Sequence, residues 1–152
     1  IGGAVGWEWE GFSARGTVVT DVIRATRGTF GEVELGYGFQ PTEWLALSLS
    51  TKMVGSDSAE HKARFGITTF EATRSAAIGA GLPRYTPVAG FTSAGISGSA
   101  TYLFNVFDEN FGLTAVASYD RLFGQAADSP LVADYGSPNQ IFGGLTLSWR
   151  AF

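Results

Sequence analysis

Seven stretches of the sequence alternate apolar and polar residues with a period of two, the pattern of a β-strand with one apolar face. The stretches are residues 1–9, 12–22, 29–39, 44–54, 92–104, 110–121 and 141–151. Most have about the 9–11 residues that a tilted strand needs to cross a bilayer. The sequence contains no run of about 18 apolar residues, which a transmembrane helix would need. The chain is therefore predicted to be all-β.

Within the bodies of these stretches the charged side chains fall on the polar parity, together with serine, threonine and glycine. Arg121, at a strand end, is the exception. The candidate charges of this face are Glu8, Arg15, Asp21, Glu32, Glu34, Lys52, Asp120 and Arg150. The arrangement suits a membrane barrel with an inward polar face, because Arg or Lys facing lipid at mid-bilayer costs about 2–4 kcal/mol. Inside such a barrel these charges form either an ion-pair network or a charge-lined pore that biases ion passage.

Alternation alone is also compatible with a soluble barrel whose apolar face points inward. The aromatic residues favour the membrane, because most of them gather near one set of strand ends. The candidate girdle consists of Trp7, Trp9, Phe12, Tyr37, Phe39, Trp44, Tyr102, Phe104, Phe111 and Trp149. Trp and Tyr have an apolar body and a polar tip, so they suit a membrane interface, whereas a soluble core would scatter them.

The lengths of the connections agree with this prediction. Short connections at 10–11, 40–43 and 105–109 lie at the aromatic end, and long ones at 55–91 and 123–140 lie at the other. The connection at 24–28 is a short exception on the long-loop side. Short turns on one side and long loops on the other are usual in outer-membrane barrels. Within the first long loop, residues 70–76 can form a helical turn that Thr68 or Thr69 caps.

The segment YDRLFGQAADSPLVADYGSPNQIFGGLTLSWRAF, residues 119–152, resembles the closing part of the MipA/OmpV family, also called the MltA-interacting protein family. The residues that fit are Tyr119, Arg121, Leu122, Gly124, Ala127, Asp128, Ser129, Pro130, Gly136, Ser137, Leu147, Ser148, Trp149, Arg150 and Phe152. A second block, FGITTFEATRSAAIGAGLPRYTPVAGF at 65–91, is similar to the family's long-loop motif. Residues 1–54 match more loosely.

The resemblance implies a non-enzymatic protein of the bacterial outer membrane, folded as an antiparallel up-and-down transmembrane β-barrel in one domain. Its implied partners are the lipid bilayer, a lytic transglycosylase and a penicillin-binding protein. It would link the two enzymes to each other for peptidoglycan remodelling. Bacterial single-chain barrels have even strand numbers. Seven strands therefore lead us to expect further strands before Ile1, about ten in all, with residues 1–152 as the C-terminal portion.

Composition narrows the possible chemistry. The chain has no Cys and one His, so a thiolate or multi-histidine metal site is excluded, and no cofactor is expected. A net charge of −4 argues against nucleic acid as a partner. We expect His61 to be an exposed loop residue. Asp128, Ser129 and Pro130 are expected to build a turn.

Three functions remain open on the sequence. The first is an envelope scaffold of the MipA/OmpV type, and the second is a porin-like channel that passes small solutes. The third is a soluble ligand-binding β-barrel. Conductance in planar bilayers separates the first two, and dependence on detergent separates both from the third.

Overall fold

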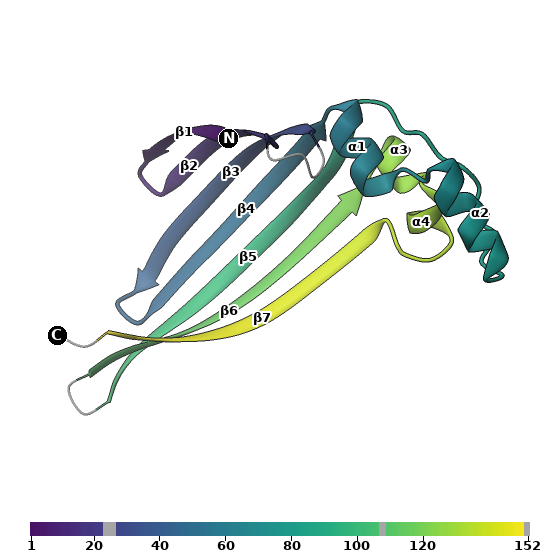
Figure 1. The fold of residues 1–152 in the computed structure, drawn as a ribbon. Coiled ribbons are helices and arrows are strands. Elements are labelled where there is room, and N and C mark those ends of the chain that lie inside the picture. The colour runs from purple at the N-terminus through teal and green to yellow at the C-terminus, as the bar shows by residue number, and fades with distance from the viewer. Residues whose placement is uncertain (23–26, 107–108, 151–152) are drawn as a thin grey trace.

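The computed structural model describes residues 1–22, 27–106 and 109–150, and one antiparallel sheet forms its body (Figure 1). Its strands are β1 (Gly2–Trp9), β2 (Phe12–Thr20), β3 (Thr29–Thr42), β4 (Leu45–Ser56), β5 (Gly90–Val106), β6 (Glu109–Leu122) and β7 (Asn139–Arg150). Their order in the sheet equals their order in the chain, so each strand pairs with its sequence neighbour. The predicted all-β, up-and-down arrangement is confirmed. Within the described chain β1 and β7 are outer strands that do not pair with each other, so the sheet is open.

The strands lie where the period of two predicts them, with ends that differ by a few residues. The β1–β2 turn takes positive φ at Glu10 (46°) and Gly11 (87°). Two successive residues with positive φ are typical of the tight hairpin turn that matches strand twist. Two of the predicted connections fall in part outside the described residues. These parts are residues 107–108 of the connection at 105–109 and residues 24–26 of the connection at 24–28.

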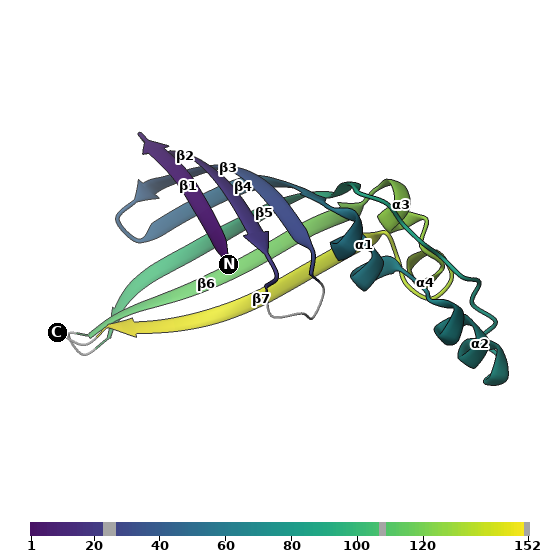
Figure 2. The ribbon, with the colours of Figure 1, turned by 45° about the horizontal axis from the view of Figure 1, so that its top comes forward.

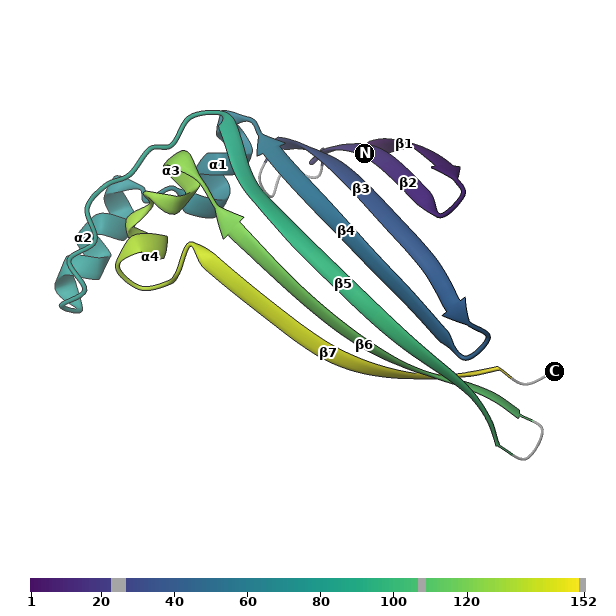
Figure 3. The same ribbon diagram turned by 180° about the vertical axis from the view of Figure 1, so that it is seen from behind.

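The two faces of the sheet differ in exposure. On the apolar face, Val33 is 55% and Leu145 75% exposed, and Leu113 and Leu147 are exposed as well. Glu32 and Glu34, which alternate with the apolar residues of β3, are half-buried and so less exposed than their apolar neighbours. Figures 1 and 2 show a curved sheet, and Figure 3 shows its convex back. Crowding on a concave surface explains why the polar side chains are the better shielded set.

Four helices gather at one end of the sheet (Figure 1). Helices α1 (Ser58–Phe65) and α2 (Thr69–Ala77) lie between β4 and β5, and α3 (Gly124–Ala127) and α4 (Pro130–Ala133) lie between β6 and β7. The largest fully buried side chains among the described residues, His61, Pro87 and Ser129, all belong to this end. The compact core of the chain is therefore in the long connections and not in the sheet. No helix among the described residues is long and apolar enough to cross a membrane.

Helix α2 agrees with the predicted turn at 70–76. Thr68 accepts a hydrogen bond from the Glu71 N–H, and the Glu71 carboxylate accepts one from the Thr68 N–H, which completes a capping box. The Thr68 N–H and the Thr68 hydroxyl both donate to the Glu71 carboxylate, each at 2.8 Å, and these two bonds hold the pKa of Glu71 below its usual value. Helix α1 was not predicted. Its sequence signal is Asp57 three residues before Glu60, the spacing of a helix start.

Candidate functional site

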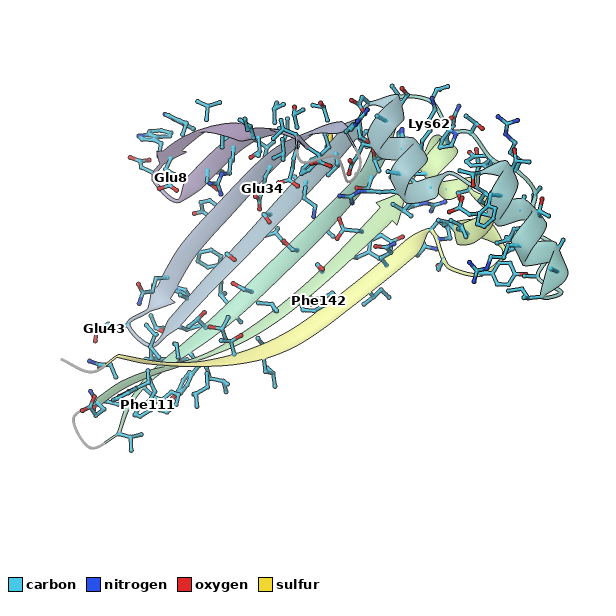
Figure 4. All side chains as sticks on the ribbon, in the orientation of Figure 1. Glu8, Glu34, Glu43, Lys62, Phe111 and Phe142 are labelled. Carbon is cyan, nitrogen blue, oxygen red and sulfur yellow. The ribbon has the colours of Figure 1, made fainter. Side chains whose placement is uncertain are left out.

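The polar, concave face of the sheet carries a row of charges at one level. The strand register places Arg15, Glu34, Lys52, Gly95 and Asp120 directly opposite one another in consecutive strands, from β2 to β6. Directly opposite residues point to the same face of a sheet. The row therefore crosses the hollow in the order positive, negative, positive, gap, negative. Figure 4 shows Glu34 on β3 over this face.

An ion pair closes the gap in this row. Lys52 Nζ lies 3.6 Å from Asp120 Oδ1, although β5 separates the two strands. Gly95 of β5 stands between them, and a Cβ atom on this glycine would collide with the Asp120 carboxylate. The missing side chain at position 95 is therefore what lets Asp120 reach over β5 toward Lys52.

Hydroxyl pairs line the rest of the hollow. Across β4 and β5, Ser48 bonds Ser99 and Ser50 bonds Ser97, both at 2.8 Å. Further pairs join Thr101 to Thr114 and Ser56 to Thr92, both at 2.9 Å. Each of these bonds joins one hydroxyl donor to one hydroxyl acceptor on the neighbouring strand.

The predicted charges do not form one network. Among the described residues, no ion pair joins Glu8, Glu32 or Glu34 to a basic side chain. Asp21 lies beyond the end of β2, where its carboxylate accepts a hydrogen bond from the Arg27 N–H at 3.3 Å. It therefore belongs to the β2–β3 connection and not to a strand. The side chain of Arg150 lies outside the description.

Nine of the ten predicted girdle residues lie in ring contact with another member. The centroid distances are Trp7–Trp9 6.3 Å, Phe12–Tyr37 4.5 Å, Tyr37–Phe39 5.7 Å, Trp44–Tyr102 5.6 Å, Tyr102–Phe104 5.9 Å and Phe104–Phe111 5.6 Å. The tenth, Trp149, lies opposite Phe111 in the register, and its indole N–H donates to the Glu109 carboxylate at 3.0 Å. These residues make up the aromatic band of the convex face.

The aromatic band runs obliquely to the strands. The row of Phe12 continues through Tyr37 and Leu49 to Gly98 in β5, whereas the band crosses β5 at Phe104, six residues further along. From Phe104 it continues straight to Phe111 and Trp149. With about 3.3 Å per residue and about 4.8 Å between strands, this displacement from β2 to β7 tilts the strands by roughly 40° from the normal to the band.

Helix α1 covers one end of the hollow, and its first turn is fixed by Asp57. The Asp57 carboxylate accepts hydrogen bonds from the N–H groups of Glu60 (2.8 Å), Ala59 (2.9 Å) and Thr29 (2.9 Å). The bond from Glu60 has the largest effect on the pKa of Asp57. Together with the bonds from Thr29 and Ala59, it holds this pKa below the usual value of 3.8, although desolvation acts in the opposite direction. Since Thr29 opens β3, the same carboxylate starts α1 and ties it to the sheet.

His61 holds the middle of α1, and the prediction that it is an exposed loop residue is wrong. The residue is 1% exposed. Its Nδ1 lies 2.6 Å from the Val88 carbonyl oxygen, and its Nε2 lies 3.1 Å from Thr92 Oγ1. Because a carbonyl oxygen can only accept, Nδ1 carries the proton. The two ring nitrogens therefore pin α1 to the segment before β5, through Val88, and to β5 itself, through Thr92.

The far end of α1 is also tied down. The Ser129 hydroxyl, which is fully buried, donates to the Phe65 carbonyl oxygen at 2.7 Å. Ser129 is the N-cap of α4 and Pro130 is its first residue, so the predicted turn at 128–130 links two short helices. Nearby, the Tyr85 hydroxyl donates to the Gln125 carbonyl oxygen at 2.8 Å. Burial, and then the negative charge of Asp128, raise the pKa of Tyr85.

Between α1 and the polar face lies a recess of about 490 Å³. Its roof contains Glu60, Arg64 and Phe65 of α1, and its floor contains residues of β3 to β7, among them Glu32, Lys52 and Asp120. In the roof, Arg64 Nε donates to the Glu60 carboxylate, and the Arg64 guanidinium lies 5.9 Å from the centre of the Phe30 ring. Within the described chain, no group of three or more metal-binding side chains is placed to hold an ion.

Comparison with curated proteins found no match. Comparison with solved structures found none either. A family model does match: that of the MltA-interacting protein MipA, over residues 1–151. This match covers essentially the whole chain, including the first 54 residues, where the sequence motifs are weakest. The chain belongs to the MipA family of MltA-interacting proteins.

Proposed function

We propose that this protein is an outer-membrane β-barrel that binds the lytic transglycosylase MltA and so acts as a scaffold for peptidoglycan remodelling. The family name supplies the partner. The observation that carries the membrane location is the exposed apolar face together with its oblique aromatic band. A large exposed apolar surface needs a cover, and a tilt near 40° is within the usual range of transmembrane barrel strands.

The proposal includes closure of the sheet. The outer edges of β1 and β7 carry backbone groups without partners in the sheet, and hydrocarbon does not tolerate such groups. In the membrane both edges are therefore paired. The polar face then lines the inside, and α1 lies across one of its ends.

Two neighbouring residues of β7 test which face meets lipid. Leu145 is on the apolar face, and Thr146, next to it, is on the polar face. We expect Leu145→Arg to reduce folding into lipid vesicles by about 2–4 kcal/mol, because the charge would lie in hydrocarbon. Thr146→Arg is the matched control and is expected to fold nearly as well as the parent. Equal behaviour of the two variants would refute the membrane orientation.

The short-turn end of the sheet is the surface we assign to the partner. In the usual barrel orientation short turns face the periplasm, and Glu10, Glu43 and Glu109 lie at this end. Figure 4 shows Glu43 there and Lys62 at the opposite, helical end. Because the chain has no cysteine, single variants Glu43→Cys and Lys62→Cys provide clean crosslinking sites. We expect crosslinks to MltA from position 43 and none from position 62; crosslinks only from 62 would reverse the assignment.

A porin-like channel is the second candidate, and the charged row on the concave face favours it. A face lined by hydroxyl pairs and alternating charges can support water and ions. Planar-bilayer recording of the folded protein decides the matter, since a scaffold is silent and a channel conducts. The orientation of the apolar face does not favour the soluble ligand-binding barrel.

A further inference from the structure

The recess under α1 holds more acidic than basic groups, and this imbalance has a specific origin. Its lining contains three carboxylates, Glu32, Glu60 and Asp120, and two basic groups, Lys52 and Arg64. Lys52 pairs with Asp120, and Arg64 pairs with Glu60. The side chain of Glu32 has no hydrogen bond or ion pair with any described residue. One carboxylate in the recess is thus left without a counter-charge.

The recess is already shaped before anything binds. Its roof is fixed at three points, through Asp57 at the start of α1, His61 in the middle and Phe65 at the end. Glu60 itself is 5% exposed, so the roof charge cannot swing out into solvent. A volume of about 490 Å³ falls in the range of small-molecule sites. A fixed cavity loses little entropy when a ligand enters.

Aromatic rings make the recess suitable for a cation that also has an apolar part. Phe30 and Phe65 contribute to its lining, and one cation, the Arg64 guanidinium, already lies over the Phe30 ring. Ring faces attract cations and also contact alkyl groups. We propose that the recess between α1 and the polar face binds a small organic ammonium ion, whose charge is matched by Glu32. This proposal does not depend on a scaffold or channel function.

The test is an NMR titration of the full folded chain in detergent micelles, with butylammonium as the probe. We expect saturable shifts at the amides of Glu32, Glu60 and Arg64. Butanol and butyrate have the same alkyl chain without the positive charge, so they are expected to give no saturable shifts there. In about 1 M NaCl, where charges are screened beyond about 3 Å, binding of butylammonium should weaken strongly.

A matched pair of variants assigns the charge. Glu32→Gln removes the unmatched carboxylate with little change in shape, and we expect it to weaken binding about tenfold, the typical effect of losing one charged contact. Glu34→Gln is the control, since Glu34 lies on the same face of the same strand but does not line the recess. If both variants weakened binding equally, the general negative potential of the hollow would explain the binding, and the specific role of Glu32 would be refuted. Binding of butanol as tight as that of butylammonium, or no saturable binding by the parent protein, would also overturn the proposal; the parent measurements need no variant to fold.

Discussion

Lys52 and Asp120 form an ion pair across an intervening strand, with Nζ 3.6 Å from Oδ1. Direct cross-strand pairs join neighbours in a sheet, but here β5 lies between β4 and β6. The contact exists because Gly95 leaves the space above β5 empty and because the polar face is concave. The side chains are 39% and 26% exposed, so water screens the attraction in part.

The first prediction concerns this gap. Gly95→Ala would place a Cβ atom against the Asp120 carboxylate and push it away from Lys52. We expect the free energy of unfolding to fall by about 1 kcal/mol, the upper range for a partly exposed ion pair. Denaturant titration of the folded barrel in micelles measures this. Gly98→Ala is the control, because its Cβ would meet only ordinary contacts on the other face.

A double-mutant cycle separates the ion pair from other effects of the new methyl group. In an Asp120→Ala background the clash with the carboxylate and the ion pair are both gone, and only the 2.9 Å approach of the new Cβ atom to the Tyr119 carbonyl oxygen is left. Gly95→Ala should therefore cost clearly less stability there than in the parent background. A loss as large as in the parent background would mean that Gly95 matters for a reason other than Asp120.

Gly28 plays a similar part where α1 meets the sheet. A Cβ atom at Gly28 would collide with the backbone of Glu60, so the helix rests on this glycine. Gly28→Ala is expected to lift α1 and to cost about 1–3 kcal/mol, as overpacking of a fixed contact does. Gly31→Ala, three residues along, meets only one atom at an ordinary 3.8 Å and should be nearly neutral. Hydrogen exchange of the α1 amides reports the lifting; unchanged protection in Gly28→Ala would contradict it.

The sheet could be predicted from the sequence because the alternation repeats in each strand independently of its neighbours. Short connections favour the pairing of β1 with β2, β3 with β4 and β5 with β6, whereas β4 pairs with β5 and β6 with β7 across the long connections. The aromatic band was also visible, since it depends only on which strand ends carry rings. Which rings contact each other, and the oblique course of the band across the sheet, follow from the register of the paired strands. The sequence alone does not specify this register.

The helical cover of the hollow could not be predicted in the same way. Residues 58–65 are mostly polar and have no apolar stripe to mark a helix, although Asp57 and Glu60 have the spacing of a helix start. His61 is buried because Val88 and Thr92, far along the chain, surround it. The Lys52–Asp120 pair likewise depends on Gly95 of β5, the strand that lies between the two partners. Contacts of this kind arise only when distant segments meet.

The third prediction concerns His61. His61→Ala would leave a cavity and remove both ring hydrogen bonds, so we expect the helical end to lose about 2–4 kcal/mol of local stability. Limited proteolysis should then cut within α1, while the strands stay resistant. Lys62→Ala is the matched control, because Lys62 is the next residue and is exposed (Figure 4). If both variants were cut at the same rate, the buried ring would have no anchoring role.

The last prediction follows from the lowered pKa of Asp57. A carboxyl whose pKa is lower in the folded than in the unfolded chain stabilises the fold above its unfolded pKa, and this stabilisation is lost as the pH falls toward the folded value. The stabilisation is therefore complete above about pH 4, near the usual value of 3.8, and declines in more acidic solution. We expect the amides of Ala59, Glu60 and Thr29 to lose hydrogen-exchange protection below about pH 4. Asp57→Asn can still accept hydrogen bonds but does not ionise, so its protection should not change over this range. Glu71→Gln, which alters the corresponding cap of α2, should leave the acid response at Thr29 intact. A parent protein whose Thr29 amide stays protected at pH 2 would show that Asp57 does not tie α1 to β3 through its charge.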